Sequence, residues 1–286
     1  MTAAVILFST FLRDIVSFLP PGIVPAFATA FLEGGKYLGA FRHEFVGTLV
    51  MVACTFSAGK WIGTESIRVA WTSHLLGVIA ADYLSGGPHV NPAVTTSMFA
   101  LGKCSYSEAF VRICAQLAGG LVAFPLFHAV SDTMKWEPFG GPEFNMKDDN
   151  DHAAEAFLSE FAATFLLCWV IYILNWEMIF GTYHYIIKQS LTAVAIRALI
   201  EFFPTAGPAM NPMLATTWSV FGVGNKFEYP AHFQHYFVYW IAPCLAAVLA
   251  SLVYVVYAGG TFFGVKLPMG PIKPQPPKAE AKKKKN

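Results

Sequence analysis

Six apolar stretches place the strongest constraint on what this chain can fold into. They cover approximately residues 44–62, 67–84, 109–130, 154–175, 185–203 and 235–258. A helix of about 20 apolar residues is long enough to cross the hydrocarbon layer of a membrane. Only 13% of the residues are charged and 55% are hydrophobic, against roughly 25% charged residues in soluble domains. We therefore expect an all-α, multi-pass protein embedded in a lipid bilayer.

The two ends of the chain depart from this pattern. Residues 1–39 form an apolar or interfacial extension with Arg13 and Asp14 at the centre of its first apolar stretch. We expect an extra N-terminal helix there, and a seventh membrane span is the alternative. Residues 263–286 form a tail rich in Pro and Lys, which should be disordered from Pro268 onward.

Charge is distributed unevenly along the sequence. Lysines are concentrated in the last 21 residues, whereas most charged residues of the loop at residues 131–152 are acidic. Because basic residues favour the cytosolic side of a membrane, this asymmetry places the tail in the cytosol. No DNA-binding motif accompanies these lysines, so a solvated or membrane-surface tail is favoured and no nucleic-acid partner is expected.

A pair of polar residues recurs near the start of the first and fourth apolar stretches. Glu44 precedes Thr48 in "HEFVGTLV", and Glu160 precedes Thr164 in "SEFAATFL". Each pair lies one helical turn apart on one face. Carboxylates inside a membrane need a partner, and backbone amides of nearby loops are the expected partners here.

An Asn-Pro pair follows each of these motifs, at Asn91 and at Asn211. Asn is a good helix N-cap and Pro is favoured at the first helical position, so each pair predicts a helix start. The helices at residues 91–102 and 211–222 are too short to cross a bilayer. They are therefore expected to be half-helices, entered by the loops "LSGGPHV" and "FPTAGPAM".

The motifs define an internal repeat within a channel domain at residues 40–262. Its halves are residues 40–130 and residues 153–262, each with three apolar stretches and one Asn-Pro segment. Because three spans are an odd number, the second half enters the membrane with opposite polarity. The expected fold is six transmembrane helices and two re-entrant half-helices, whose starts meet near the midplane.

The sequence resembles the aquaporin family at several separate motifs. "SGGPHVNPAVT" is similar to the first signature loop, "AQLAGGLVA" to the third span and "YWIAPCLAAVLASLVY" to the sixth. The signature residues are Asn91, Pro92, Ala93, Asn211, Pro212 and Met213. The residues that match the family's loop-anchoring positions are Glu44, Thr48, Glu160, Thr164, His89 and Gln116.

The resemblance implies a passive channel rather than an enzyme. It implies a homotetramer with one pore per subunit, in which Asn91 and Asn211 donate their amides to small neutral permeants. The two half-helix N-termini would oppose cations and protons there. We expect no cofactor and no metal, because neither the five cysteines nor any other motif has the required spacing.

The sequence departs from the family where the pore should be narrowest. Leu214 stands where an Arg normally follows the second triplet, and an ungapped count puts Trp71, Leu199 and Pro208 at the other positions of the selectivity filter. Together with the apolar N-terminal extension and the lysine-ended tail, this apolar filter makes the sequence more similar to the unorthodox intracellular branch, the superaquaporins. It predicts modest water permeability and tolerance of glycerol or hydrogen peroxide.

Three alternatives remain open at this stage. Arg197 and Glu201 form either an ion pair within one helix or, by way of Arg197, a replacement for the missing filter cation. An ion-coupled transporter, or a membrane scaffold whose pore is closed by bulky residues such as Met213, competes with the passive channel. His74 is expected to be a packing or interface residue.

The last four residues, "KKKN", carry a candidate address signal. Lys283 and Lys284 lie four and three positions from the end, which resembles a dilysine retrieval signal. The implied location is the endoplasmic reticulum or another intracellular membrane, and the alternative is a generic lysine-rich tail.

Overall fold

The computed structural model describes residues 36–55, 67–134, 152–222 and 229–274. Most of the N-terminal extension, the acidic loop and the final lysines therefore lie outside the described residues. Within these ranges the chain is almost entirely helical, with one two-stranded hairpin formed by β1 (Thr261–Phe262) and β2 (Val265–Lys266).

The described helices follow the same order twice. In the first half they are α3 (Leu38–Thr55), α5 (Ile67–Ser85), the half-helix α6 (Pro92–Ala100) and α7 (Tyr106–Met134). In the second half they are α8 (Ala153–Tyr172), α9 (His184–Phe202), the half-helix α10 (Pro212–Gly222) and a continuous helix at Phe233–Ala258. That last helix comprises α11 (Phe233–Tyr236), a π-helical turn (Phe237–Ile241) and α12 (Ala242–Ala258).

Three of the described helices are long and apolar enough to cross a membrane by composition alone. They are Tyr106–Leu126, Ala153–Glu177 and Phe233–Ala258. The remaining long helices carry charged residues in their interiors, such as Asp82 in α5 and Arg197 in α9. These charges lower the hydropathy of the helices.

The two motif glutamates lie deeper in their helices than the sequence predicted. Glu44 follows the first residue of α3, Leu38, by six positions, and Glu160 follows the first residue of α8, Ala153, by seven. Each helix begins one to two turns before its motif, so each carboxylate lies on the body of a helix rather than at its start. Both glutamates are completely buried.

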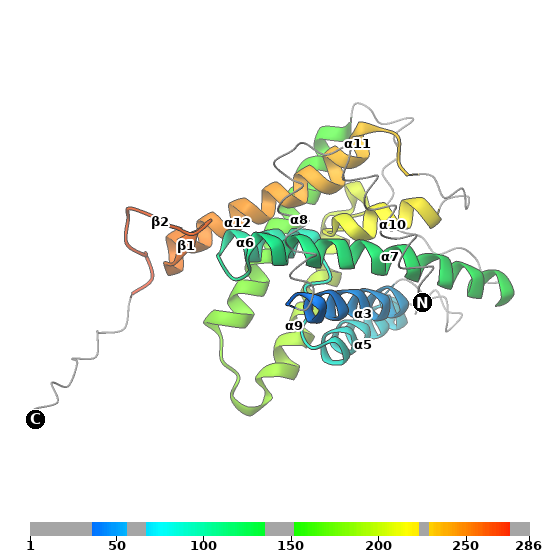
Figure 1. Cartoon of the computed structure of the whole chain (residues 1–286), viewed down its shortest axis with the longest axis horizontal. Coiled ribbons are helices and arrows are strands. Elements are labelled where there is room, and N and C mark those ends of the chain that lie inside the picture. The colour runs from blue at the N-terminus through cyan, green and yellow to red at the C-terminus, as the bar shows by residue number, and fades with distance from the viewer. Residues whose placement is uncertain (1–35, 56–66, 135–151, 223–228, 275–286) are drawn as a thin grey trace, which may run out of the picture.

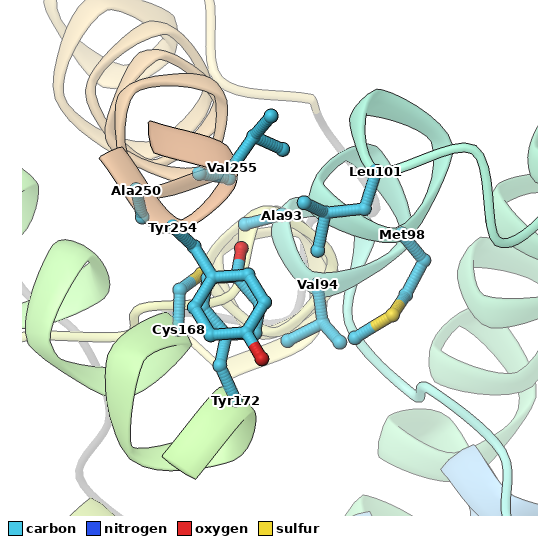
Figure 2. Packing of buried hydrophobic residues seen from close by; sticks show 10 residues of the cluster. Ala93, Val94, Met98, Leu101, Cys168, Tyr172, Ala250, Tyr254 and Val255 are labelled. Carbon is cyan, nitrogen blue, oxygen red and sulfur yellow. The ribbon is translucent and has the colours of Figure 1, made fainter. Parts of the chain in front are cut away.

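Each half-helix packs against helices of the opposite half. Figure 2 shows Ala93, Val94 and Met98 of α6 beside residues of α8 and α12. The half-helix α10 packs on α7, where a Cβ at Gly120 would lie 2.6 Å from the sulfur of Met213. This crossed packing joins the two halves into one core.

Glycine also lets α3 approach α7, which lies beside it (Figure 1). A Cβ at Gly119 would lie 2.8 Å from the Cβ of Thr48 and 2.9 Å from the carbonyl oxygen of Phe45. Small residues permit such close helix packing in membranes. The adjacent glycines of "AQLAGGLVA" therefore hold α7 against two different helices.

The start of the tail is ordered, contrary to the expectation of disorder from Pro268 onward. The amides of Ile272 and Lys273 donate to the carbonyls of Val256 (3.2 Å) and Tyr257 (2.8 Å) on α12. The ammonium of Lys273 also pairs with the carboxylate of Glu177, which raises the pKa of Lys273 above its ordinary value. These backbone bonds, which composition does not reveal, fix residues up to Pro274.

We expect Lys273→Ser to loosen this segment without unfolding the protein, because the ion pair is one of only a few contacts that hold it. Proteolytic cleavage between residues 266 and 274 should become severalfold faster in detergent. Lys266→Ser, on the exposed hairpin strand β2, is the matched control and should leave the rate unchanged. Equal cleavage rates for both variants would show that the ion pair does not hold the tail.

Candidate functional site

Both Asn-Pro pairs cap a half-helix as the sequence predicted. The Oδ1 of Asn91 accepts from the amide of Ala93 at 2.8 Å, and the Oδ1 of Asn211 accepts from the amide of Met213 at 3.1 Å. Pro92 and Pro212 are the first residues of α6 and α10. Each asparagine thus satisfies one of the free amides at a helix start.

The same two asparagines bind each other's loops. The Nδ2 of Asn91 donates to the carbonyl of Met210 at 2.7 Å, and the Nδ2 of Asn211 donates to the carbonyl of Val90 at 2.9 Å. These reciprocal bonds fix the two half-helix starts against one another. An amide has two N–H donors, so each asparagine retains a second one.

The residue before each asparagine has a strained backbone. Val90 and Met210 both have φ of 50°, a left-handed conformation that is uncommon for residues other than glycine and most unfavourable for a β-branched one. Such strain amounts to about 1–3 kcal/mol per residue. It occurs at the two carbonyls that accept the reciprocal asparagine bonds, so tertiary contacts hold the strained geometry at both places.

Glu44 anchors the first loop with both carboxylate oxygens. Oε1 accepts from the amide of His89 at 2.9 Å, and Oε2 accepts from the amide of Val90 at 2.8 Å. Two side chains of α7 also donate to it, Arg112 at 2.6 Å and Gln116 at 2.8 Å. Arg112 compensates the buried charge of Glu44. The sequence motifs did not reveal this partner.

His89 and Gln116 complete this network through Thr95 on α6. The Nδ1 of His89 lies 3.1 Å from the hydroxyl of Thr95, and Gln116 Nε2 donates to that hydroxyl at 2.9 Å. A single network therefore joins α3, the first loop, α6 and α7.

Glu160 holds the second loop with fewer partners. Its Oε2 accepts from the amide of Ala209 at 3.1 Å, whereas Oε1 has no hydrogen-bond partner among the described residues. No described cation forms an ion pair with it, in contrast to Glu44.

The threonines of the two motifs do not anchor the loops by hydrogen bonds. The hydroxyls of Thr48 and Thr164 are buried and have no partner in the described part of the chain. Thr48 instead packs against Gly119 of α7. Neither threonine hydroxyl therefore forms an anchoring hydrogen bond to a described loop.

A cavity of about 900 Å³ extends from one side of the asparagines to the other. It is lined by Asn91, Asn211 and one face of α9 from Tyr185 to Ile200. That stretch of helix corresponds to roughly 22 Å at 1.5 Å per residue. We call this 900 Å³ space the central cavity.

Two of the four expected filter residues line the central cavity. Pro208 and Leu214 do so, but Trp71 and Leu199 are not among its lining residues. Leu199 is buried in a cluster with Ala163, Leu167 and Met210. The ungapped count therefore selected residues near the lining positions of α5 and α9 that do not themselves reach the cavity.

His74 and Arg197 occupy those two walls instead. Arg197 forms the predicted ion pair with Glu201 on the same helix, and its replacement of the filter cation stays a prediction. His74 is 8% exposed and lines the cavity, which corrects its assignment as a packing residue. The spacing of His74, Val78 and Ala81 along one face of α5 was the available signal.

Met213 does not close the cavity. Its side chain is completely buried beneath Gly120 of α7 and is absent from the cavity lining. The described residues also contain no group of His, Cys, Asp or Glu side chains able to hold a metal ion. Lys283 and Lys284 lie outside the described residues.

The inverted pair of half-helices, joined at their starts beside a long cavity, is the architecture of an integral membrane channel. The model of the major intrinsic protein family matches residues 60–254. The chain belongs to this family, whose members are membrane channels rather than enzymes.

Characterised relatives and a solved structure agree with this assignment. An aquaglyceroporin of Plasmodium berghei (strain Anka) is 29% identical over 77% of this chain and 89% of its own length. Aquaporin-5 of Homo sapiens is 28% identical over 76% and 80%, respectively. The structure of the aquaglyceroporin from Plasmodium falciparum covers 77% of this chain and 96% of that one, with a TM-score of 0.60 and 23% identity, and shows the same fold.

We expect Glu44→Leu to destabilise the protein by about 3 kcal/mol, because it leaves loop amides and part of the Arg112 guanidinium unpaired in a buried site. Glu160→Leu should have a smaller effect, since fewer donors lose a partner. Thermal unfolding in detergent measures both.

Thr48→Val is the control on the same helix, because the Thr48 hydroxyl has no partner in the described residues. It should unfold close to the wild-type temperature. A Glu44→Leu protein as stable as Thr48→Val would contradict the anchoring role of the carboxylate.

Proposed function

We propose that this protein is a passive membrane channel for water and small uncharged solutes. The observation that carries the proposal is a long cavity lined by Asn91 and Asn211 at the point where two half-helices begin. The second N–H of each asparagine provides a donor for a passing molecule. The similarity to aquaporins and aquaglyceroporins supports the same class of permeant.

The two half-helix starts supply a barrier against cations. Each helix N-terminus carries the equivalent of roughly +0.5 charge, and the reciprocal asparagine bonds hold both starts at the same level of the cavity. This positive potential repels cations, which also lose hydrating water in the cavity. It does not repel neutral molecules. This part of the barrier belongs to the backbone.

We further propose the full arrangement in the membrane as six spans, with the tail at residues 263–286 in the cytosol and four subunits forming a homotetramer. The repeated order of helices supports six spans. The lysine-rich tail supports its side of the membrane. The tetramer rests on the family resemblance alone.

The competing functions are less well supported by the geometry. An ion-coupled transporter needs an ionisable relay near mid-membrane, but Glu44 and Glu160 are absent from the cavity lining and bind loop amides instead. A scaffold with a pore closed by Met213 is not favoured either, because that side chain packs under Gly120.

The outer end of the cavity supports passage of solutes larger than water. Pro208 and Leu214 give this end an apolar wall, which forms no hydrogen bonds with water and accepts the carbon skeleton of glycerol. Hydrogen peroxide is a further proposed permeant. Leu214 and Met213 in the second signature also support placing the chain in the superaquaporin branch.

We expect Leu214→Arg to lower glycerol flux relative to water about fivefold in stopped-flow measurements on liposomes. The arginine narrows the cavity and adds donors that favour water, each worth on the order of 1 kcal/mol. Val265→Arg adds the same charge on an exposed strand and is the control.

Wild-type liposomes, with and without an ion gradient, separate the competing functions. Swelling that requires the gradient would indicate a coupled transporter. A folded protein that raises no flux would indicate a scaffold. An unchanged or higher ratio of glycerol to water flux in Leu214→Arg would contradict the position of Leu214 in the filter.

We propose residence in the endoplasmic reticulum through the terminal lysines. Changing Lys283 and Lys284 to Ser should move a tagged protein toward the plasma membrane, because a dilysine signal acts by position from the end. Changing Lys278 and Lys282 to Ser removes the same charge elsewhere in the tail and should leave the location unchanged. Equal imaging of both double variants would contradict the signal.

A further inference from the structure

Two nitrogen-bearing side chains face each other at one end of the central cavity. The helices α5 and α9 run antiparallel, since Trp71 bonds to Glu201 at one end of the pair and Asp82 bonds to Tyr185 at the other. This register puts His74 level with Arg197. Both side chains line the cavity, and Arg197 is near enough to act electrostatically on His74.

Both side chains have unused hydrogen-bonding capacity. The Nε2 of His74 is buried without a partner among the described residues. The Nε of Arg197 donates to Glu201, but its terminal nitrogens carry none of the hydrogen bonds found in the described ranges. A buried polar group without a partner is unfavourable. A molecule whose hydroxyl groups reached these nitrogens would supply the missing partners.

Glu201 fixes the orientation of the arginine. Its Oε1 accepts from Arg197 Nε at 3.2 Å and from Trp71 Nε1 at 2.9 Å. Because the Nε edge of the guanidinium is occupied, its terminal nitrogens remain free to face the cavity. Trp71, which the sequence placed in the filter itself, instead bonds to Glu201, which in turn bonds to Arg197.

We propose that His74 and Arg197, from α5 and α9, form the polar side of the selectivity constriction opposite Pro208 and Leu214. They bind the hydroxyl groups of small neutral solutes such as glycerol, and Arg197 excludes small cations. Glu201 and Trp71 are positioning residues. This assignment rests on the proposed channel function and gives the constriction the positive charge that position 214 lacks.

The test measures fluxes of glycerol, water and methylammonium, a small cation, in liposomes carrying each variant. Arg197→Leu should raise methylammonium flux about fivefold, because the fixed charge is lost. Arg197→Lys should keep the cation out yet lower glycerol flux, because the planar fork of donors is lost. Arg68→Leu removes the same charge from an exposed site near the start of α5 and should leave all three fluxes unchanged.

His74→Leu keeps a side chain of similar size but removes its nitrogens. We expect glycerol flux to fall about fivefold relative to water, with methylammonium still excluded. Glu201→Leu should lower glycerol flux because the arginine loses its orientation. Glu201→Gln retains an oxygen acceptor and should restore the glycerol flux. If Glu201→Gln and Glu201→Leu unfold at the same temperature and Glu201→Gln does not restore the flux, Glu201 does not orient the arginine.

The outcomes distinguish failure of the channel function from failure of the assignment of His74 and Arg197. Absence of water and glycerol flux in wild-type liposomes would overturn the channel function and this assignment together. Normal wild-type flux with unchanged glycerol and methylammonium flux in Arg197→Leu would overturn the assignment alone. If Arg197→Leu does not fold, Arg197→Lys and His74→Leu decide, and unchanged glycerol flux in both would overturn it.

Discussion

The reciprocal hydrogen bonds between two asparagines and the opposite loops are the interaction on which the remaining structure depends. Asn91 and Asn211 each cap their own half-helix and donate to the carbonyl of Met210 or Val90 across the repeat. These bonds require two loops to enter the protein from opposite sides and stop at the same depth. They also align two helix N-termini beside one cavity, where their partial charges act together.

The two strained loops are held in place by hydrogen bonds to a buried carboxylate, and the two halves of the protein differ in these bonds. In the first loop Glu44 binds two amides while Arg112 and Gln116 satisfy the rest of its carboxylate. In the second loop Glu160 has one bonded oxygen and no paired cation among the described residues. The inverted repeat is thus symmetric in backbone but unequal in electrostatics, which makes the first loop the more firmly anchored.

The cavity is equally uneven in its polarity. Pro208 and Leu214 line it with apolar side chains, whereas His74 and Arg197 line it with polar ones. Such a lining combines donors for hydroxyl groups with surface for carbon atoms, so it suits solutes that have both.

The sequence alone determined the features that depend on local chemistry. Asn followed by Pro favours a helix start, so the pairs at Asn91 and Asn211 predicted both half-helices. The need of a carboxylate inside a membrane for partners likewise predicted the hydrogen bonds between Glu44 and its loop. Tertiary structure alone decided that His74 and Arg197, rather than Trp71 and Leu199, line the cavity. Trp71 lies one helical turn from His74 on the same helix, so helical spacing does not separate them and only packing between helices decides which side chain reaches the cavity.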